Sequence, residues 1–157
     1  MEGSLFDESE FFRAIAGSGV RALLIGRRAL VALGIPVLTA DYDFWLHADD
    51  VSAFNAALAP LGLLPTRTPE EARGRGRYVL ENDERVDVLV ARSAPTVDGL
   101  TVSFADVWAR RRGLELAPGA EVAVPSLDDL ILTKRFGGRP KDLEDIRLLE
   151  ALKREEP

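Results

Sequence analysis

An alternation of acidic and apolar residues at positions 41–47 constrains the fold of this chain more than any other stretch. Two carboxylates, Asp41 and Asp43, alternate with three large apolar residues, Tyr42, Phe44 and Leu46. Side chains of a β-strand point alternately to its two faces, so both carboxylates would share one face while the apolar side chains enter a core. The carboxylates would lie about 7 Å apart along the strand. This spacing suits the binding of one or two hard cations.

A second apolar stretch, Arg85 to Val90, contains a single acidic residue. Its valines at 86, 88 and 90 would form a buried face, with Asp87 on the opposite face. An unpaired carboxylate is costly to bury, so Asp87 needs a partner or solvent. A metal ion shared with Asp41 and Asp43 would provide one. The alternative is that Asp87 faces solvent or pairs with an arginine such as Arg85, and the pattern leaves both open.

The residue types present limit which metal the chain can bind. Its 157 residues are the usual size of a single domain, so we expect one domain over 1–157. Cysteine is absent and His47 is the only histidine, which excludes disulfides, thiolate sites and His-cluster zinc sites. A metal would be held by oxygen ligands, which favours Mg²⁺ or Mn²⁺. The net charge of −6 argues against a broad nucleic-acid-binding surface.

The N-terminal residues 1–12 are acidic, the wrong pattern for a signal peptide. The longest apolar runs are far too short to span a bilayer. We therefore expect a cytoplasmic protein without a membrane partner.

Hydrophobic periodicity and turn residues predict a mixed α/β (α+β) fold. Helices are expected at 7–16, 28–33, 50–61, 104–112, 126–136 and 140–153. Strands are expected at 22–25, 41–47, 77–81, 86–91 and 121–124. The Arg- and Gly-rich stretch 65–76 is predicted to be a loop. The result is a small mixed sheet flanked by helices, with a helical C-terminus.

Two segments carry candidate anion-binding groups. Gly26 ends an apolar strand just before a helix, where backbone N–H groups can hold a phosphate. Lys134 continues the apolar stripe of the helix at 126–136, so it either extends outward to solvent or reaches into a cleft. Arg139 and Lys141 follow closely and could complete an anion-binding corner oriented by Asp142 and Asp145. Alternatively, they form ordinary surface pairs, such as Lys141 with Asp145.

These parts occur in an order that resembles a known family. The segment from Leu24 to Asp43, with Gly26-Arg27, Gly34-Ile-Pro36 and Asp41-Tyr-Asp43, resembles the first motif of DNA-polymerase-β-like minimal nucleotidyltransferases. It is most similar to AbiEii-type toxins and nucleotidyltransferase antitoxins. Asp87 resembles the third carboxylate of that family, and residues 124–145 resemble its C-terminal helices. The resemblance covers roughly residues 20–150. The chain differs from the family at two positions. Arg27 stands where the family has Gly or Ser, and Val37 stands where the family has Arg.

The resemblance implies an activity and roles for individual residues. An NMP unit would pass from an NTP to a hydroxyl of an RNA, protein or small-molecule acceptor. Mg²⁺ or Mn²⁺ would be held by the carboxylates Asp41, Asp43 and Asp87. The phosphates would contact Gly26, Arg27, Lys134, Arg139 and Lys141.

Two other functions remain open. Arg27 and Val37 motivate a non-catalytic module that binds nucleotide or a partner protein, as in a toxin–antitoxin pair. An unrelated α/β domain with surface acids would bind no metal.

Overall fold

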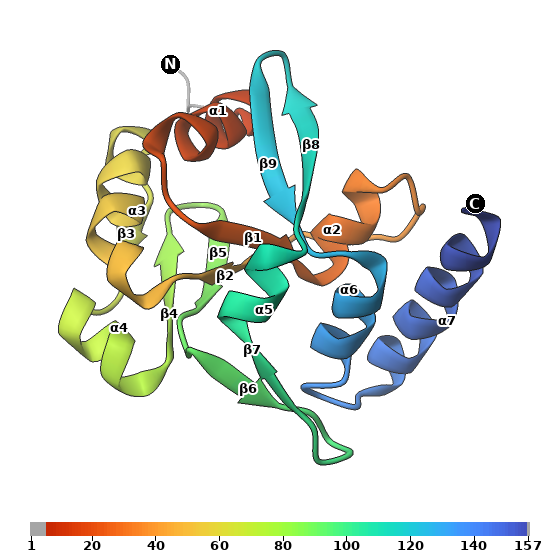
Figure 1. Ribbon diagram of the computed structural model, residues 1–157. Coiled ribbons are helices and arrows are strands. Elements are labelled where there is room, and N and C mark those ends of the chain that lie inside the picture. Colours follow the sequence, from red (N-terminus) through yellow and green to blue (C-terminus); the bar gives the residue numbers. More distant parts are fainter. Residues whose placement is uncertain (1–5, 157) are drawn as a thin grey trace.

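A seven-stranded mixed sheet organises the chain, for which a computed structural model describes residues 6–156 (Figure 1). Its order is β3(Leu64–Pro65), β4(Arg77–Glu81), β5(Arg85–Leu89), β2(Tyr42–Leu46), β1(Ala22–Ile25), β9(Ala120–Val124) and β8(Arg112–Ala117). The β2–β5 and β1–β9 pairs are parallel, and the other neighbours are antiparallel. A short ribbon of β6(Ser93–Pro95) and β7(Thr101–Ser103) stands apart from this sheet.

Helices surround the sheet. They are α1(Glu8–Ser18), α2(Gly26–Ala32), α3(Val51–Leu58), α4(Pro69–Arg75), α5(Phe104–Ala109), α6(Leu127–Lys134) and α7(Pro140–Glu155), with 3₁₀ turns η1(Ala48–Asp50) and η2(Ala59–Leu61). In Figure 1, α1 and α3 lie at the opposite end of the molecule from the antiparallel pair α6 and α7. No helix within residues 6–156 is long and apolar enough to cross a membrane.

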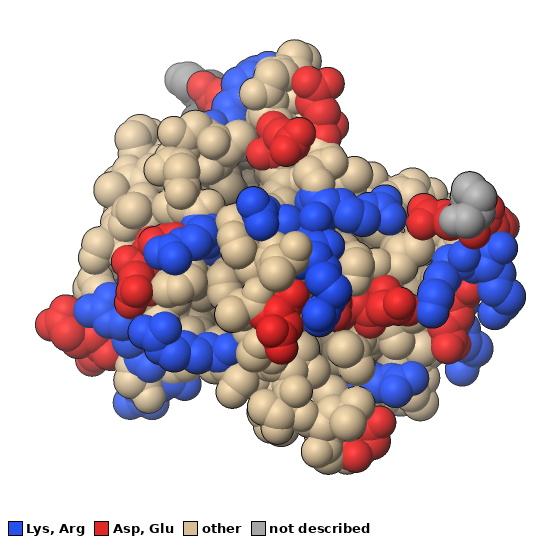
Figure 2. All heavy atoms as spheres, viewed as in Figure 1, with Lys and Arg blue, Asp and Glu red and all other residues tan. Residues whose placement is uncertain are grey.

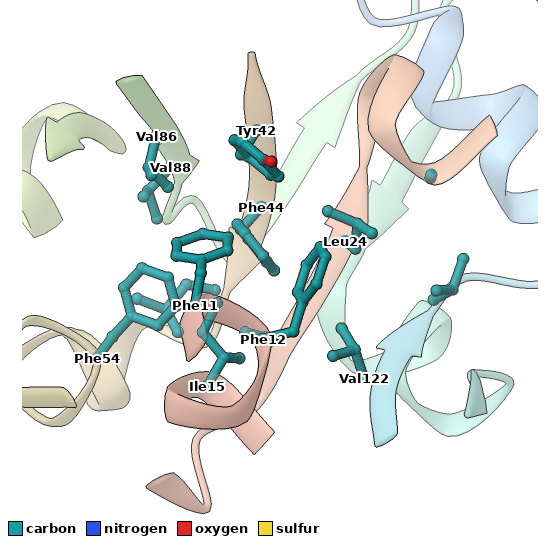
Figure 3. Close-up of a cluster of buried hydrophobic side chains, with 14 of the residues drawn as sticks. Phe11, Phe12, Ile15, Leu24, Tyr42, Phe44, Phe54, Val86, Val88 and Val122 are labelled. Atoms are coloured by element: carbon teal, nitrogen blue, oxygen red, sulfur yellow. The ribbon is translucent and has the colours of Figure 1, made fainter. Parts of the chain in front are cut away.

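The main core lies on the face of the sheet that receives the even-numbered residues of β2. Phe44 and Leu46 are fully buried there, and Tyr42 nearly so. Figure 3 shows the side chains of α1 pointing at this face, with Phe11 and Phe12 beside Phe44 and Leu24. The alternation read from 41–47 is therefore confirmed, and it turns the odd-numbered positions toward the other face.

A smaller core covers that other face. Trp45 is fully buried among Leu23, Val102, Phe104 and Val107, and its indole Nε1 donates a hydrogen bond to the Ala91 carbonyl at 2.8 Å. Trp45 therefore has the packing role that large aromatic residues usually have. The β6–β7 ribbon and α5 form this cover, which closes one end of the face and leaves the Asp43 end open.

Local signals set most helix boundaries as expected. The carboxylate of Asp7 accepts from the Glu10 amide at 3.2 Å and caps α1. The hydroxyl of Ser126 accepts from the Asp129 amide and caps α6, and Pro140 is the first residue of α7. The helix predicted from residue 28 begins instead at Gly26. The helix predicted at 50–61 is divided into η1, α3 and η2. The break between α3 and η2 is at Pro60, which lacks the N–H that a continuous helix needs.

The predicted loop at 65–76 is wrong. It contains the end of β3 and the helix α4, which begins with a capping box between Thr68 and Glu71 and has Pro69 in its first turn. The two glycines and the arginines of this stretch concealed that signal. Strand β8 and the β6–β7 ribbon were also missed. β8 is an edge strand whose register shifts between Glu115 and Ala117, and β6 and β7 have only three residues each.

Candidate active site

A cleft of about 590 Å³ opens on the face of the sheet that carries Asp43. It crosses the strands in the order β1, β2, β5 and β4, and helices α6 and α7 close one side. Its lining includes five of the predicted site residues: Gly26, Asp43, Asp87, Lys134 and Arg139. Residues separated by more than 100 positions in the chain thus meet at one place.

Asp43 and Asp87 lie directly opposite each other on neighbouring parallel strands. Both are half-buried, and the Asp87 side chain is 34 % exposed. Asp41 lies one residue before β2 and is exposed, outside the cleft lining. Within residues 6–156, no three His, Asp or Glu side chains are close enough together to hold a metal ion. The structure brings two of the predicted carboxylates together and leaves the third at the rim.

The carboxylate of Asp43 is electrostatically unfavourable as it stands. Burial, followed by the negative charges of Asp87 and Asp41, raises its pKa to about 6, although Lys134 and Lys141 oppose this shift. Among the described residues, no side chain forms an ion pair or a hydrogen bond with Asp43. Its charge is therefore held between like charges without a compensating partner.

The chemistry of this donor set suits a divalent cation, although only Asp43 and Asp87 are adjacent in the described part of the chain. The available ligands are carboxylate oxygens alone, the ligands that Mg²⁺ and Mn²⁺ prefer. A cation would compensate the unpartnered Asp43 and its neighbour Asp87, and Asp41 is near enough to act on Asp43 electrostatically. In the present arrangement the guanidinium of Arg85 donates hydrogen bonds to the carboxylate of Asp87 at 3.1–3.2 Å. The pair of Asp87 with Arg85 is therefore present, and a role of Asp87 as a metal ligand stays a prediction.

Gly26 is required by its conformation and by its neighbour. Its φ of +70° lies in the left-handed region that favours glycine. A β-carbon added here would also collide with the carboxylate of Asp43, whose own Cβ would be 3.0 Å away. The turn therefore brings the backbone at the start of α2 into contact with the carboxylate.

Arg27 and Lys134 meet on one buried carboxylate. Asp145 of α7 is fully buried, and it accepts from the Lys134 ammonium at 2.7 Å and the Arg27 guanidinium at 3.1 Å. The side chain of Lys134 is only 6 % exposed, so it enters the cleft and does not extend to solvent. The alternative surface pair of Lys141 with Asp145 is absent among the described residues, because Asp145 points inward.

The remaining C-terminal cations differ in placement. Arg139 lines the cleft and is held by the buried carboxylate of Asp142, with Nε at 2.9 Å from Oδ2. Lys141 is exposed and outside the cleft lining. Asp142 and Asp145 orient Arg139, Arg27 and Lys134, which places these acids in the structural support of the site.

The predicted set of site residues does not include the opposite wall of the cleft. Arg67, Arg77 and Arg85 line it, together with Thr66 and Val79. Arg67 lies beside α4, in the stretch predicted to be a loop. The capping box at Thr68 was the signal that could have indicated an ordered segment.

Comparison with solved structures identifies the architecture. A candidate nucleotidyltransferase of Thermotoga maritima is 16% identical, aligns over 93% of this chain and 90% of its own, and has a TM-score of 0.59. The lincosamide antibiotic adenylyltransferase LnuA, bound to lincomycin, is 15% identical over 94% of this chain and 98% of its own, with a TM-score of 0.61.

A third similar structure is that of ANT(2″)-Ia in complex with adenylyl-2″-tobramycin. It is 15% identical, aligns over 90% of this chain and 84% of its own, and has a TM-score of 0.61. No protein-family model and no curated protein matches the sequence. Together with the mixed sheet and its flanking helices, these similarities show that the chain has the nucleotidyltransferase fold.

Proposed function

We propose that this protein transfers an NMP unit from an NTP to a hydroxyl group of an acceptor and releases pyrophosphate. The observation that carries the proposal is the register of Asp43 opposite Asp87 at the centre of a cleft. The same cleft contains the Gly26 turn, Lys134 and Arg139, and the chain has the nucleotidyltransferase fold. The acids and the cations therefore occur together where a nucleotide and an acceptor can meet.

The wall formed by the Gly26 turn, α6 and α7 would bind the triphosphate. Lys134 uses one of its three ammonium protons on Asp145, which leaves the others available to phosphate oxygens. The Arg27 guanidinium likewise has donors beyond those used on Asp145. Arg139 at the cleft edge, with Lys141 beyond it, would neutralise charge that builds on the leaving pyrophosphate.

Asp41, Asp43 and Asp87 would hold Mg²⁺ or Mn²⁺. When bound, the metal would make the acceptor hydroxyl more acidic and neutralise negative charge on the phosphates, as in two-metal sites. Exposed Asp41 would have to turn toward the cleft, and Asp87 would have to release Arg85. Both changes involve side chains that already have access to solvent.

The chemical step is a displacement at the α-phosphorus. The acceptor oxygen forms a bond to phosphorus, the bond to the β-phosphate oxygen breaks, and pyrophosphate leaves with that electron pair. Asp87, released from Arg85, would accept the hydroxyl proton as a general base. Gly26 would donate its backbone N–H to the phosphate, and its missing β-carbon leaves room beside Asp43.

The test is calorimetric titration with a non-hydrolysable NTP, with and without Mg²⁺, followed by an assay of label transfer from each α-labelled NTP. We expect metal-dependent binding in the wild type. Asp43→Asn should lose metal-dependent binding and turnover while remaining folded by circular dichroism. Asp49→Asn, an exposed acid distant from the cleft lining, is the matched control. Full turnover in Asp43→Asn would exclude the mechanism.

A second function is a non-catalytic module that binds nucleotide or a partner protein, as in a toxin–antitoxin system. It is favoured by the ion pairs that already engage the site: Arg85 on Asp87, and Arg27 with Lys134 on Asp145. Metal-dependent NTP binding without label transfer to water or to any acceptor would support this function over catalysis. Co-purification of one stoichiometric partner from the native host would support the partner arm.

A further inference from the structure

We propose that the acceptor carries a phosphate group and that Arg67 and Arg77 bind it. This inference rests on the proposed nucleotidyl transfer and specifies its second substrate. It concerns the wall of the cleft beyond Asp87, which we call the acceptor wall: Thr66, Arg67, Arg77, Val79 and Arg85. The nucleotide wall is the opposite one: Gly26, Lys134, Arg139 and Asp142 line the cleft there, and Arg27 and the buried Asp145 support them through ion pairs.

The order of strands separates the two walls. The Gly26 turn follows β1, the carboxylates lie on β2 and β5, and Arg77 lies on β4. Three strand spacings, about 14 Å, therefore separate the backbone of β1 from that of β4. Asp43 and Asp87, the candidate centre of the chemistry, lie between them. A group bound at Arg77 is thus on the far side of the reacting centre from the Gly26 turn.

The charges of Arg67 and Arg77 on the acceptor wall are available to a ligand. Each cation of the nucleotide wall has a carboxylate partner within 3.1 Å. In the described part of the chain, by contrast, neither Arg67 nor Arg77 lies within ion-pairing distance of a carboxylate. Glu71 attracts Arg67 only at longer range. The two guanidinium groups line one cleft. Such a pair suits the planar, two-pronged recognition of phosphate oxygens.

The backbone beside Arg67 is fixed. The amide of Thr66 donates to the Val79 carbonyl at 2.8 Å, and its hydroxyl accepts from the Val79 amide at 3.2 Å. Val79 lies directly opposite Asp87 in the β4–β5 register. On the other side of Arg67, the capping box of Thr68 and Glu71 begins α4. The backbone on both sides of Arg67 is therefore held in place by hydrogen bonds, at the level of Asp87 in the sheet. The Arg67 side chain is half-buried.

The charge of this wall is wrong for a cationic acceptor. Tobramycin, whose adenylylated form is bound in the similar structure of ANT(2″)-Ia, carries several ammonium groups. Placed here it would meet Arg67 and Arg77, and like charges in a partly desolvated cleft are repulsive. The positive charge is also local. On the face shown in Figure 2, Lys and Arg side chains are intermixed with Asp and Glu, and the net charge is −6.

The test measures acceptor binding separately from turnover. Protein saturated with Mg²⁺ and a non-hydrolysable ATP analogue is titrated with ribose 5-phosphate, ribose, tobramycin and a single-stranded RNA hexamer. Ribose 5-phosphate or the hexamer should bind at least about tenfold more tightly than ribose or tobramycin. Arg67→Gln/Arg77→Gln should remove that preference. Arg73→Gln/Arg75→Gln, which removes the same charge from α4 outside the cleft lining, should keep it.

Each outcome has a defined meaning. Preference for ribose 5-phosphate would identify a small phosphorylated acceptor, and preference for the hexamer alone would identify nucleic acid. Equal binding of ribose and ribose 5-phosphate, tighter binding of tobramycin, or equal binding by wild type and Arg67→Gln/Arg77→Gln would overturn the inference while leaving nucleotidyl transfer intact.

Nucleotide titrations separate the remaining cases. The Arg67→Gln/Arg77→Gln variant should bind the ATP analogue as the wild type does. If it loses this binding, the two arginines belong to the nucleotide site and the acceptor inference is wrong. If the wild type itself binds no NTP under any metal condition, the proposed function fails, and the inference that rests on it fails as well.

Discussion

The nucleotide wall and the acceptor wall of the cleft hold their positive charges in different ways. On the nucleotide wall, Arg27 and Lys134 are fixed on the fully buried Asp145. On the acceptor wall, Arg67 and Arg77 have access to solvent and lack carboxylate partners among residues 6–156. Buried pairs fix a geometry and make the fold depend on it. Exposed arginines can be changed at little cost to stability, so this wall is suited to setting substrate preference.

The largest expected effect would come from breaking the nucleotide wall. Asp145→Asn would leave Lys134 and Arg27 without their anion, and the loss of one partner from a buried pair costs about 3–5 kcal/mol. Urea denaturation should show this decrease in the free energy of unfolding. Asp142→Asn is the matched control on the same helix and should cost less, because its partner Arg139 is 65% exposed. Equal losses in the two variants would show that burial of the cation does not matter.

The carboxylate between the walls should make stability depend on pH. The pKa of Asp43 in the folded protein, about 6, is above its ordinary value of 3.8. The stability that protonation of Asp43 contributes is therefore fully present below about pH 4 and is lost as pH rises through 6. Over that window metal-free wild type should lose up to about 3 kcal/mol relative to Asp43→Asn. Denaturation from pH 4 to pH 7.5 measures the difference. Identical pH profiles for the two proteins would contradict the electrostatic description of Asp43.

The Gly26 turn tests how tightly the nucleotide wall approaches the centre. Gly26→Ala would place a side chain at positive φ and against Asp43, which should cost about 1–3 kcal/mol of stability. It should also weaken NTP binding, measured by the same calorimetry. Gly17→Ala, at a glycine with no atom near its added Cβ, is the control and should not weaken it. A Gly26→Ala protein of wild-type stability and affinity would show that the close approach is unimportant.

The smallest effect is expected on the acceptor wall. Arg67→Gln/Arg77→Gln removes two solvent-accessible cations that support no buried charge, so stability should change by no more than about 0.5 kcal/mol. Thermal and urea denaturation measure this directly. A loss comparable to that of Asp145→Asn would remove the contrast between the two walls.

Patterns of short range were read correctly from the sequence. The alternation at 41–47 placed Phe44 in the core and Asp43 on the opposite face, because strand geometry depends only on neighbouring residues. The beginnings of α6 and α7, predicted at 126 and 140, agree with the Ser126 cap and with Pro140 for the same reason. The prediction of a loop at 65–76 was wrong because the glycines and arginines of this stretch are typical of loops, whereas the capping box at Thr68 begins a helix.

Contacts between residues far apart in the chain could not be predicted from the sequence. No spacing indicated that Arg27 would reach Asp145, a residue 118 positions away. Lys141, four positions before Asp145, was one possible partner by its spacing but is exposed, because the buried face of α7 turns Asp145 inward. The roles assigned to Asp41, Asp43, Asp87 and the cations remain predictions for experiment.

The sequence by itself determined most of the strands and helices, and the identity of the acids and cations that can serve a nucleotide. Those properties follow from local periodicity, capping and residue chemistry. Tertiary structure alone decided that Asp43 faces Asp87, that Asp145 holds Arg27 and Lys134, and that Arg67 and Arg77 form the other wall. These placements depend on strand order and helix packing, which arise from burial of the whole apolar surface and leave no signature at a single spacing.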